Sequence, residues 1–583
     1  MPNNKLLSKI PFYGIALIFT ILIVSLFKLQ VVQGEDYKQI AEENYVRIKN
    51  IQPVRGEILD REYRPIAINK PSYNLYIILG KIREKDKVID FVSRNFAIEK
   101  EKIKETIYQN RFRLYQEIRL VQNIDYEKLI AISEQLNYFP SLFFKTETRR
   151  EYLYPNHFTG YVGRIDEQEF SKLKDKGYSI NSMLGKSGLE KYYEEMLAGK
   201  SGYEILQVDA AGNNLQFFKH NLEKKPENGE SLILTIDNEL QEYISSIFPG
   251  KAKGCIVVSD IKNGEILAYI SKPDFDQNIF GNNLSTDDWN KILQDPSKPM
   301  LDRVIHGTYP PGSVYKPVMA FLGLEENVID KKTKLTKCDG GMQFGDRYFK
   351  CWWEKGHGRL NVVDAIKQSC DVFFYDLSTR FTLEQINNYT KKNKLCVRIG
   401  IDLPGERAGF FPTKDWYKQN YGRYISITGQ KVNIAIGQGE VLVTPLQICS
   451  FYAAIGNDGI WKQPHFLLKT VEHQKNTTFK QEYLPVNREH LELIQKSLYK
   501  VVNEQYGTGT AAGVYGVKVY GKTGSAENHM GKETHAWFTG YAEWEEPEIA
   551  FVVFLENAGH GGSAAAPLAR KIVKFYDWMM KER

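Results

Sequence analysis

The amino-acid sequence lacks the features that mark several large classes of protein. Its 583 residues contain one long uncharged apolar run, and we find no internal repeat, no low-complexity tract and no glycine-rich phosphate-binding loop. The 77 basic and 71 acidic side chains are interspersed and leave a formal net charge of only +6, so the sequence gives no support for nucleic-acid binding. The length predicts more than one globular domain, with ample residues for a large core.

The one apolar run, at residues 10–27, is long enough to span a bilayer with some help from the apolar residues that follow. Lys5 and Lys9 precede it, so we expect residues 1–9 to stay cytoplasmic and the rest of the chain to be exported. A cleaved signal peptide is the alternative, but no small-residue cleavage site follows the run. The sequence therefore predicts an uncleaved anchor at residues 10–32.

A linker divides the exported part into two regions, because the stretch KKPENG at residues 224–229 is rich in charge, proline and glycine. Residues 33–230 mix short β-like runs with charged helical stretches such as residues 99–109. They hold no catalytic constellation, and no glycosyltransferase is recognisable there. We expect a non-catalytic pedestal domain in this region.

Residues 231–583 are predicted to form an α+β domain. Residues 255–270 read as a hairpin around an Asn-Gly turn, and residues 549–555 read as another apolar strand. The helix predicted over residues 565–580 would pack on this sheet. Helices on the faces of a mainly antiparallel sheet are an α+β arrangement.

Three short strings occur in a fixed order in this second region, and the first is SVYK at residues 313–316. A Tyr-Pro-Pro-Gly turn precedes it and an apolar helical run follows, so Ser313 should lie at a helix N-terminus. Lys316 should lie on the same face, within reach of the Ser313 hydroxyl, as a base lies beside its nucleophile. An isolated Ser-x-x-Lys is more often a solvated helix turn. The backbone N–H groups of Ser313 and Ser525 are candidates for an oxyanion hole.

The third string, KTGS at residues 522–525, follows an alternating strand pattern, so we expect it on a strand that edges a cleft. Lys522 is a candidate second cation, which would lower the proton affinity of the base. Gly524 would let a substrate backbone approach, while Thr523 and Ser525 offer hydroxyl partners for a carboxylate. Taken alone, Lys-Thr-Gly is more often an ordinary junction between a strand and a turn.

The middle string, SCD at residues 369–371, precedes a bulky apolar run that would anchor it at the cleft wall. Ser369 and Asp371 would relay a proton or position the lysines. The alternative is a helix cap in which Ser369 satisfies backbone donors. Together the three strings supply a nucleophile, a proton shuttle and a substrate clamp, which are the parts that serine acyl transfer needs.

With the three strings in this order, the chain resembles the serine penicillin-recognising enzymes, and among them the membrane-anchored class B penicillin-binding proteins. The resemblance covers nearly the whole chain, because further short stretches match in the same order. These are PVRGEILDR from residue 53, GKSGLE from residue 185, TID from residue 235, GQG from residue 437, TPLQ from residue 444 and HAWF from residue 535.

The resemblance implies that a stem peptide ending in D-alanyl-D-alanine would acylate Ser313, with release of D-alanine, and that an amine on a neighbouring strand would then take the acyl group. It gives the base role to Lys316, the proton relay to Ser369 and Asp371, and the carboxylate and oxyanion contacts to residues 522–525. The middle string departs from the commoner Ser-x-Asn form. Its acidic residue resembles the elongation group, penicillin-binding protein 2, rather than the division group.

A candidate metal site lies in the same region, formed by Cys338, Cys351, His357 and Cys370. Three thiolates and an imidazole would make a tetrahedral structural zinc site that is closed to water. The resemblance adds to this prediction, because it implies a metal at this place, as in some elongation-type enzymes. A metal there would fix the positions of the relay residues. The alternatives are reduced core cysteines or a disulfide. We expect the other three cysteines in the core.

We therefore expect a cell-wall D,D-transpeptidase of the elongation type, anchored in the inner membrane with its catalytic domain in the periplasm. Its partners would be peptidoglycan stem peptides, β-lactams and other elongation proteins, including a polytopic glycan polymerase. The alternatives are a D,D-carboxypeptidase or β-lactamase, which begin with the same acyl-enzyme, and a non-catalytic β-lactam sensor or scaffold. No local string identifies a base for a deacylating water, which favours the transferase.

Overall fold

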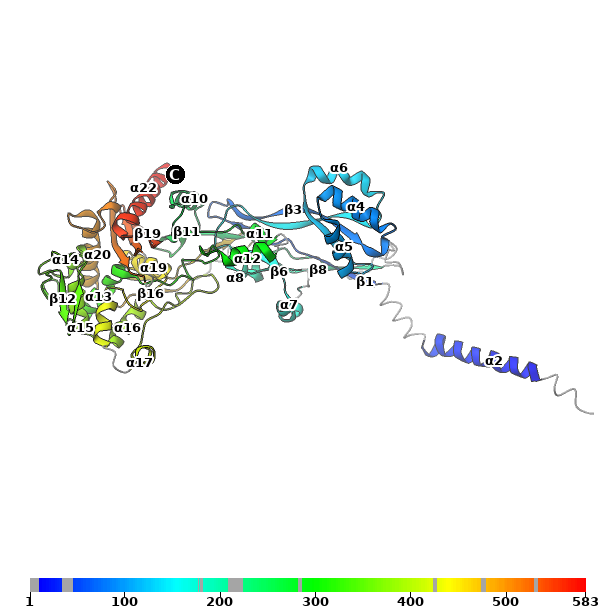
Figure 1. The fold of residues 1–583 in the computed structure, drawn as a ribbon, viewed down its shortest axis with the longest axis horizontal. Coiled ribbons are helices and arrows are strands. Elements are labelled where there is room, and N and C mark those ends of the chain that lie inside the picture. The colour runs from blue at the N-terminus through cyan, green and yellow to red at the C-terminus, as the bar shows by residue number, and fades with distance from the viewer. Residues whose placement is uncertain are drawn as a thin grey trace, which may run out of the picture.

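The computed structural model describes residues 10–33, 46–176, 178, 182–207, 224–281, 286–422, 427–472, 479–528 and 533–583. These residues form an elongated body, from which the apolar helix α2 (Ile10–Phe27) stands apart (Figure 1). Residues 1–9, which we predicted to be cytoplasmic, lie outside the described residues.

The N-terminal helix α2 continues into a short π-helical segment, η1 (Lys28–Val32). The segment Tyr13–Val32 is long and apolar enough to cross a membrane, and none of it is buried in the described part of the protein. A helix of 20 residues is about 30 Å long, which matches the hydrocarbon core of a bilayer. The prediction of a single N-terminal apolar helix is confirmed, and this helix is a candidate membrane anchor.

A head domain lies at the end of the body that faces α2 (Figure 1). Its long strand β3 (Pro65–Ile78) pairs antiparallel with both β4 (Glu117–Ile124) and β5 (Leu142–Tyr152). Apolar side chains of these strands share one core with three amphipathic helices. The helices are α4 (Lys85–Phe96), α5 (Lys100–Gln109), which is the predicted helical stretch, and α6 (Tyr126–Leu136).

The sheet of the head continues into the second region of the chain. At its Pro65 end, β3 pairs with β2 (Ile58–Leu59), and β2 runs parallel to β9 (Leu232–Leu234). β9 then pairs with β15 (Leu467–Thr470), which comes from far along the chain. The pedestal and the second region are therefore joined by backbone hydrogen bonds across one sheet as well as by the linker.

Smaller elements complete the pedestal between the head and the second region. β1 (Val46–Ile51) pairs antiparallel with β8 (Gly202–Gln207), and β6 (Val162–Arg164) pairs with β7 (Met183–Gly185). The remaining short helices are η2 (Leu79–Lys81), α7 (Glu167–Leu173), η3 (Lys174–Lys176), α8 (Gly188–Tyr192) and α9 (Glu194–Leu197).

The second region is built on a five-stranded antiparallel sheet in the order β11-β10-β19-β18-β17. The predicted hairpin consists of β10 (Lys253–Asp260) and β11 (Ile266–Lys272), and the predicted apolar strand near the C-terminus is β19 (Pro547–Glu556). β18 (His535–Glu543) pairs with β17 (Lys518–Ala526), which forms one edge of the sheet.

Helices cover this sheet. α22 (Ala566–Glu582), which is the predicted C-terminal helix, and α19 (Pro445–Gly456) both contact β18 and β19, while α20 (Arg488–Asn503) contacts β17. The TPLQ stretch explains where α19 begins, because Thr444 and Gln447 form a reciprocal capping box around a proline in the first turn. The predicted α+β fold is confirmed.

The remaining elements of the second region surround this core. They are α10 (Asn238–Ile247), α11 (Asn278–Gly281), α12 (Thr286–Gln294), η4 (Gly312–Tyr315), α13 (Lys316–Glu325), β12 (Gly341–Phe344), β13 (Arg347–Lys350), α14 (Val362–Lys367), α15 (Asp371–Thr379), α16 (Leu383–Lys392), α17 (Lys414–Tyr421), α18 (Ile427–Ala435), β14 (Ile460–Lys462), β16 (Gln481–Tyr483), η5 (Thr510–Ala512) and α21 (Gly561–Ala564).

A buried carboxylate, Glu190, holds distant parts of the pedestal together. It accepts hydrogen bonds from Arg55 Nε at 2.6 Å, Arg150 Nε at 2.7 Å and Tyr152 Oη at 3.2 Å. Burial alone would raise the pKa of Glu190, but the positive charges of Arg150 and Arg55 outweigh burial, so the pKa is lowered. Two of the stretches that carry the family resemblance, PVRG and GKSGLE, therefore meet at this one side chain.

Replacing Glu190 by alanine should destabilise the protein by about 3–5 kcal/mol, because the buried Arg150 loses its carboxylate and Arg55 keeps only its contact with Glu194. The stabilisation should be present above the ordinary pKa of a glutamate and lost as pH falls through the lowered pKa, since only the ionised form binds both arginines. Denaturant unfolding measures the effect. The control is Glu227→Ala, which removes the exposed partner of Lys200. Equal unfolding midpoints for the two variants would contradict this prediction.

Candidate active site

Ser313 lies in the 3-10 turn η4, which runs directly into α13. The preceding residue, Gly312, has φ +57°, in the left-handed region that glycine adopts without strain. Residues three apart eclipse each other in a 3-10 helix, so Ser313 and Lys316 lie on one face of the turn. Ser313 is partly exposed, whereas Lys316 is fully buried. Ser313 is therefore partly accessible to solvent, while Lys316 is enclosed by the protein.

The Lys316 amine contacts the middle string. Its Nζ donates hydrogen bonds to Ser369 O at 2.8 Å, Ser369 Oγ at 3.1 Å and Asp371 Oδ1 at 2.7 Å. An ammonium group has three N–H donors, so these acceptors use all of them. Among the described residues, the Ser313 hydroxyl is not a hydrogen-bond partner of Lys316. We expected the amine to face Ser313, and in this structure it contacts Ser369 and Asp371.

Lys522 contacts the same serine. Its Nζ donates to Ser369 Oγ at 2.8 Å and to Thr523 O at 3.1 Å. One hydroxyl oxygen therefore accepts hydrogen bonds from two buried lysines. Burial and the positive charge of Lys316 hold the pKa of Lys522 well below its usual value, and the charge of Asp371 opposes them. Burial also raises the pKa of Asp371, against the attraction of Lys316.

Ser369 has a backbone φ of +54°, a left-handed conformation that is unfavourable for residues other than glycine. The alternative in which Ser369 caps a helix is wrong, because the N-cap of α15 is Cys370 and its side chain makes no capping bond. The hydroxyl contacts the lysines instead. Strained backbone conformations occur where the surrounding contacts enforce them. At Ser369 these contacts are the hydrogen bonds with the two lysines.

Residues 522–525 lie on the edge strand β17, and the turn that carries Ser313 packs against this strand. A Cβ atom on Gly524 would lie 3.0 Å from Val314 Cγ1 and 3.1 Å from Pro311 O, so a larger residue there would displace the turn. Glycine at this position therefore sets the spacing between the serine turn and the strand.

The other two residues of the third string have partners that the sequence did not reveal. Thr523 Oγ1 lies 2.7 Å from Thr508 Oγ1, and Ser525 Oγ lies 3.4 Å from His560 Nδ1. Gln438 Nε2, from the GQG stretch, donates to Ser525 O at 3.2 Å. Of these three partners, only Gln438 lies in a short stretch that the sequence analysis had singled out. Thr508 and His560 are distant in sequence from all three strings.

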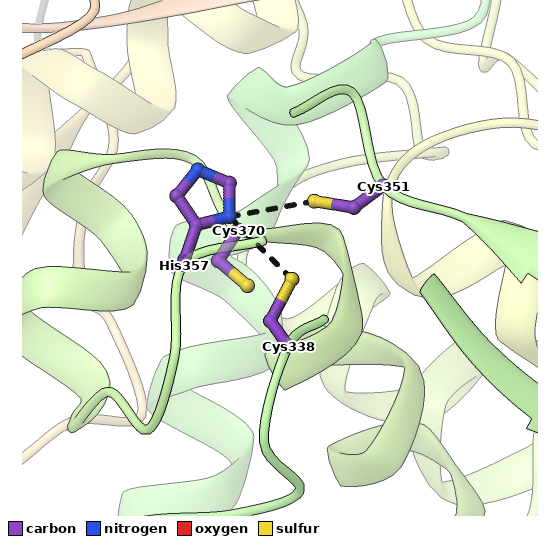
Figure 2. Close-up of side chains that lie close together, drawn as sticks. All are labelled: Cys338, Cys351, His357 and Cys370. Carbon is purple, nitrogen blue, oxygen red and sulfur yellow. Dashed lines mark hydrogen bonds between the residues drawn. The ribbon is translucent and has the colours of Figure 1, made fainter. Parts of the chain in front are cut away.

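The four candidate metal ligands lie together. Ligand atoms of Cys338, Cys351, His357 and Cys370 are all within 4.8 Å of one another, and Figure 2 shows the three sulfur atoms and one ring nitrogen gathered at one place. His357 Nδ1 lies 3.6 Å from Cys338 Sγ and 3.5 Å from Cys351 Sγ. All six cysteines are buried free thiols, so the disulfide alternative is wrong. Contact with Cys370 lowers the pKa of the Cys351 thiol.

Hydrogen bonds connect this cysteine cluster to the lysine pair. Trp352, next to Cys351, donates its backbone N–H to Asp371 Oδ2 at 3.0 Å and its indole N–H to Ser369 O at 3.1 Å. Cys370 lies between Ser369 and Asp371 in the chain. The segment of Cys370 therefore carries the partners of Lys316, and the segment of Cys351 contacts those partners through Trp352. A role for Trp352 was not predicted from the sequence. The position of this residue next to Cys351, a predicted metal ligand, was the one feature that could have indicated it.

Two family models match the chain. The penicillin binding protein transpeptidase domain matches residues 254–574, and the penicillin-binding protein dimerisation domain matches residues 50–234. Among curated proteins, the peptidoglycan D,D-transpeptidase MrdA of Haemophilus influenzae is 32% identical over 600 residues, covering 97% of this chain and 91% of the relative. MrdA of Escherichia coli K12 is 31% identical over 598 residues, covering 97% and 93%.

Solved structures agree with these matches. A complex of penicillin-binding protein PBP2 with MreC from Helicobacter pylori has a TM-score of 0.80 at 28% identity, covering 91% of this chain and 99% of that chain. A peptidoglycan synthase complex, described as coordinating polymerization and crosslinking, has a TM-score of 0.72 at 26% identity, covering 99% and 98%. The chain therefore belongs to the class B penicillin-binding proteins, in the penicillin-binding protein 2 group of peptidoglycan D,D-transpeptidases.

Proposed function

We propose that this chain cross-links peptidoglycan during lateral wall elongation through an acyl-enzyme on Ser313. Ser313 Oγ attacks the carbonyl carbon of the penultimate D-alanine of a stem peptide, the terminal peptide bond breaks, and D-alanine leaves with a proton on its amine. An amine from a neighbouring strand then attacks the ester carbonyl, the ester bond breaks, and Ser313 regains its proton. The observation that carries this proposal is the Ser369 hydroxyl shared by Lys316 and Lys522.

The proton of Ser313 needs an acceptor, and the lysine pair supplies one. Lys316 lies on the same face of the turn as Ser313, and its Nζ contacts both Asp371 and Ser369. Lys522 has a pKa held well below its usual value by burial and by Lys316, so its neutral form is accessible. We assign Ser369 as the relay through which Lys316, after accepting the proton of Ser313, passes a proton on to Lys522.

The third string supplies the substrate contacts in this proposal. An extended stem peptide adds to the open edge of β17 through backbone hydrogen bonds. The hydroxyls of Thr523 and Ser525 bind its terminal carboxylate, beside the amine of Lys522. The backbone N–H groups of Ser313 and Ser525 stabilise the oxyanion that forms when the carbonyl is attacked. Gly524 keeps the strand and the serine turn closely packed, because a Cβ atom there would meet Val314 and Pro311.

Labelled penicillin tests the acyl-enzyme. The folded chain should form one long-lived adduct, and peptide mapping should find it on Ser313. Ser313→Ala should give none at an unchanged unfolding midpoint, because only the nucleophile is lost. Ser378→Ala, which removes a buried hydroxyl of α15 that donates to Tyr375 O, should label normally. Rapid loss of the label would favour the hydrolase, and folded wild-type protein without an adduct would contradict the proposal.

We further propose that Cys338, Cys351, His357 and Cys370 hold a structural zinc ion. Tetrahedral zinc, with bonds of about 2.0–2.3 Å, needs ligand atoms roughly 3.3–3.8 Å apart. The His357 contacts of 3.5 and 3.6 Å and the thiol-rich donor set fit this requirement. A bound ion would stabilise the thiolates and fix the two loops that carry Ser369, Asp371 and Trp352, so its role is to position the relay.

Metal analysis tests this site. The purified chain should carry about one zinc ion, and Cys338→Ser should reduce the zinc content and lower the unfolding temperature, because metal binding is coupled to folding of the ligand loops. Cys449→Ser, at a buried cysteine outside the cluster, should keep the zinc. Wild-type chain that contains no zinc, and whose unfolding temperature does not rise when zinc is added, would contradict the proposal.

We place the catalytic domain in the periplasm, with α2 in the inner membrane and residues 1–9 in the cytoplasm. The support is the single apolar helix and the two lysines before it. The chain has no recognisable glycan polymerase, so a polytopic polymerase would supply the strands. The relatives solved with MreC and as a synthase complex support elongation proteins as partners.

A further inference from the structure

Three loops of the head meet beyond the Ile78 end of β3, which is the opposite end from the one that pairs with β2. Strands β4 and β5 both begin opposite the last residues of β3. The segments that precede them, residues 110–116 and 137–141, therefore lie beside the turn that follows β3, residues 79–83. We call these three loops the distal rim.

Hydrogen bonds fix the loops of the distal rim to one another and to the end of β3. The N–H of Ile78 donates to Ser141 O at 2.9 Å, and the N–H of Gly80 donates to Leu114 O at 2.6 Å. A Cβ atom on Gly80 would lie 2.9 Å from the ring of Tyr115, so glycine allows the two loops to pack closely. The distal rim is therefore an ordered surface with a defined shape.

The distal rim exposes large apolar side chains. Phe112 is 84% exposed and Tyr138 is 83% exposed, although they come from different loops, and Leu114 and Tyr115 are also exposed. The guanidinium of Arg111 lies 4.4 Å above the ring of Phe112. Apolar side chains gathered on one exposed surface mark an interaction site, because soluble proteins otherwise bury such groups.

The charges of the distal rim have one sign. It contains Lys81, Arg83, Arg111 and Arg113 and no acidic residue. None of these four forms an ion pair with another described residue. Some lysines elsewhere in the head pair with carboxylates, among them Lys70, Lys87, Lys100 and Lys145. The rim cations are therefore available to an anionic partner, and aromatic rings among cations are typical of proteins that bind the membrane interface.

The chain keeps the head close to the bilayer that α2 would span. Thirteen residue steps separate Gln33, at the end of the apolar segment, from Val46, at the start of β1. A chain of that length reaches at most about 45 Å. The head also lies at the end of the body that faces α2 (Figure 1). A lipid surface is therefore the anionic partner that this chain always has within reach.

We propose that the distal rim binds the anionic surface of the membrane. Its aromatic side chains enter the interface to a depth of about 5–10 Å, and its four cations bind lipid phosphates. This second attachment, added to α2, fixes the tilt of the pedestal and so the height of the catalytic domain above the bilayer. The inference does not depend on the chemistry of Ser313.

The test uses the full chain in proteoliposomes that contain phosphatidylglycerol. All six natural cysteines are buried, so a single introduced cysteine can be labelled selectively with a fluorophore. Asn137→Cys places the probe on the distal rim, and Tyr515→Cys, at a fully exposed tyrosine in the second region, is the control. Spin-labelled lipids should quench the probe at residue 137 strongly and the probe at residue 515 weakly.

Variants of the distal rim separate the contribution of its aromatic side chains from that of its cations. Phe112→Ser, and the pair Arg111→Glu with Arg113→Glu, should each lower the quenching at residue 137 toward the level at residue 515. Replacing phosphatidylglycerol by phosphatidylcholine should act like the charge reversal. Equal quenching at the two positions in the unaltered chain would overturn the proposal. So would quenching that is insensitive to these variants, and shielding of the probe at residue 137 only after a protein partner is added would identify a protein-binding surface instead.

Discussion

The active site depends on two buried lysines that share one hydroxyl oxygen. Lys316 and Lys522 both donate to Ser369 Oγ, and Asp371 is the carboxylate that Lys316 contacts. Two ammonium groups and one carboxylate in a buried site leave one positive charge uncompensated, which costs several kcal/mol in free energy. The site lowers this cost by depressing the pKa of Lys522, so that one lysine is readily neutral. A neutral amine next to a shared hydroxyl is what a proton relay requires.

The surrounding structure holds these groups in place from several directions. The turn of Ser313 packs on β17 through Gly524, and the backbone of Gly312 donates to Gly437 O at 2.8 Å. Trp352, which lies next to the cysteine cluster, donates hydrogen bonds to both Ser369 O and Asp371 Oδ2. The pedestal is held together in a similar way, because the buried carboxylate of Glu190 forms ion pairs with two arginines from different segments. Each of these contacts joins segments that are far apart in the chain.

Local sequence patterns predicted the elements but not the contacts between them. The hairpin of β10 and β11, the strand β19 and the helix α22 followed from turn residues and apolar periodicity, which are properties of neighbouring residues. The partners of Lys316 did not, because Ser369 and Asp371 reach it through the packing of α15 against α13. Trp352 was missed for the same reason. The lowered pKa of Lys522 depends on burial and on the nearby charge of Lys316, and no local sequence pattern indicates either.

The pH dependence of penicillin acylation tests the central claim most directly. Acylation should be fast above the lowered pKa of Lys522 and should slow as pH falls through it, because only the neutral amine accepts a proton. The charge of Asp371 raises this pKa, so Asp371→Asn should shift the fall in rate to lower pH. Asp376→Asn, on the same helix but hydrogen-bonded to Thr336, should leave it unchanged. A shift of the Asp371→Asn profile to higher pH, or none, would contradict the shared-lysine account.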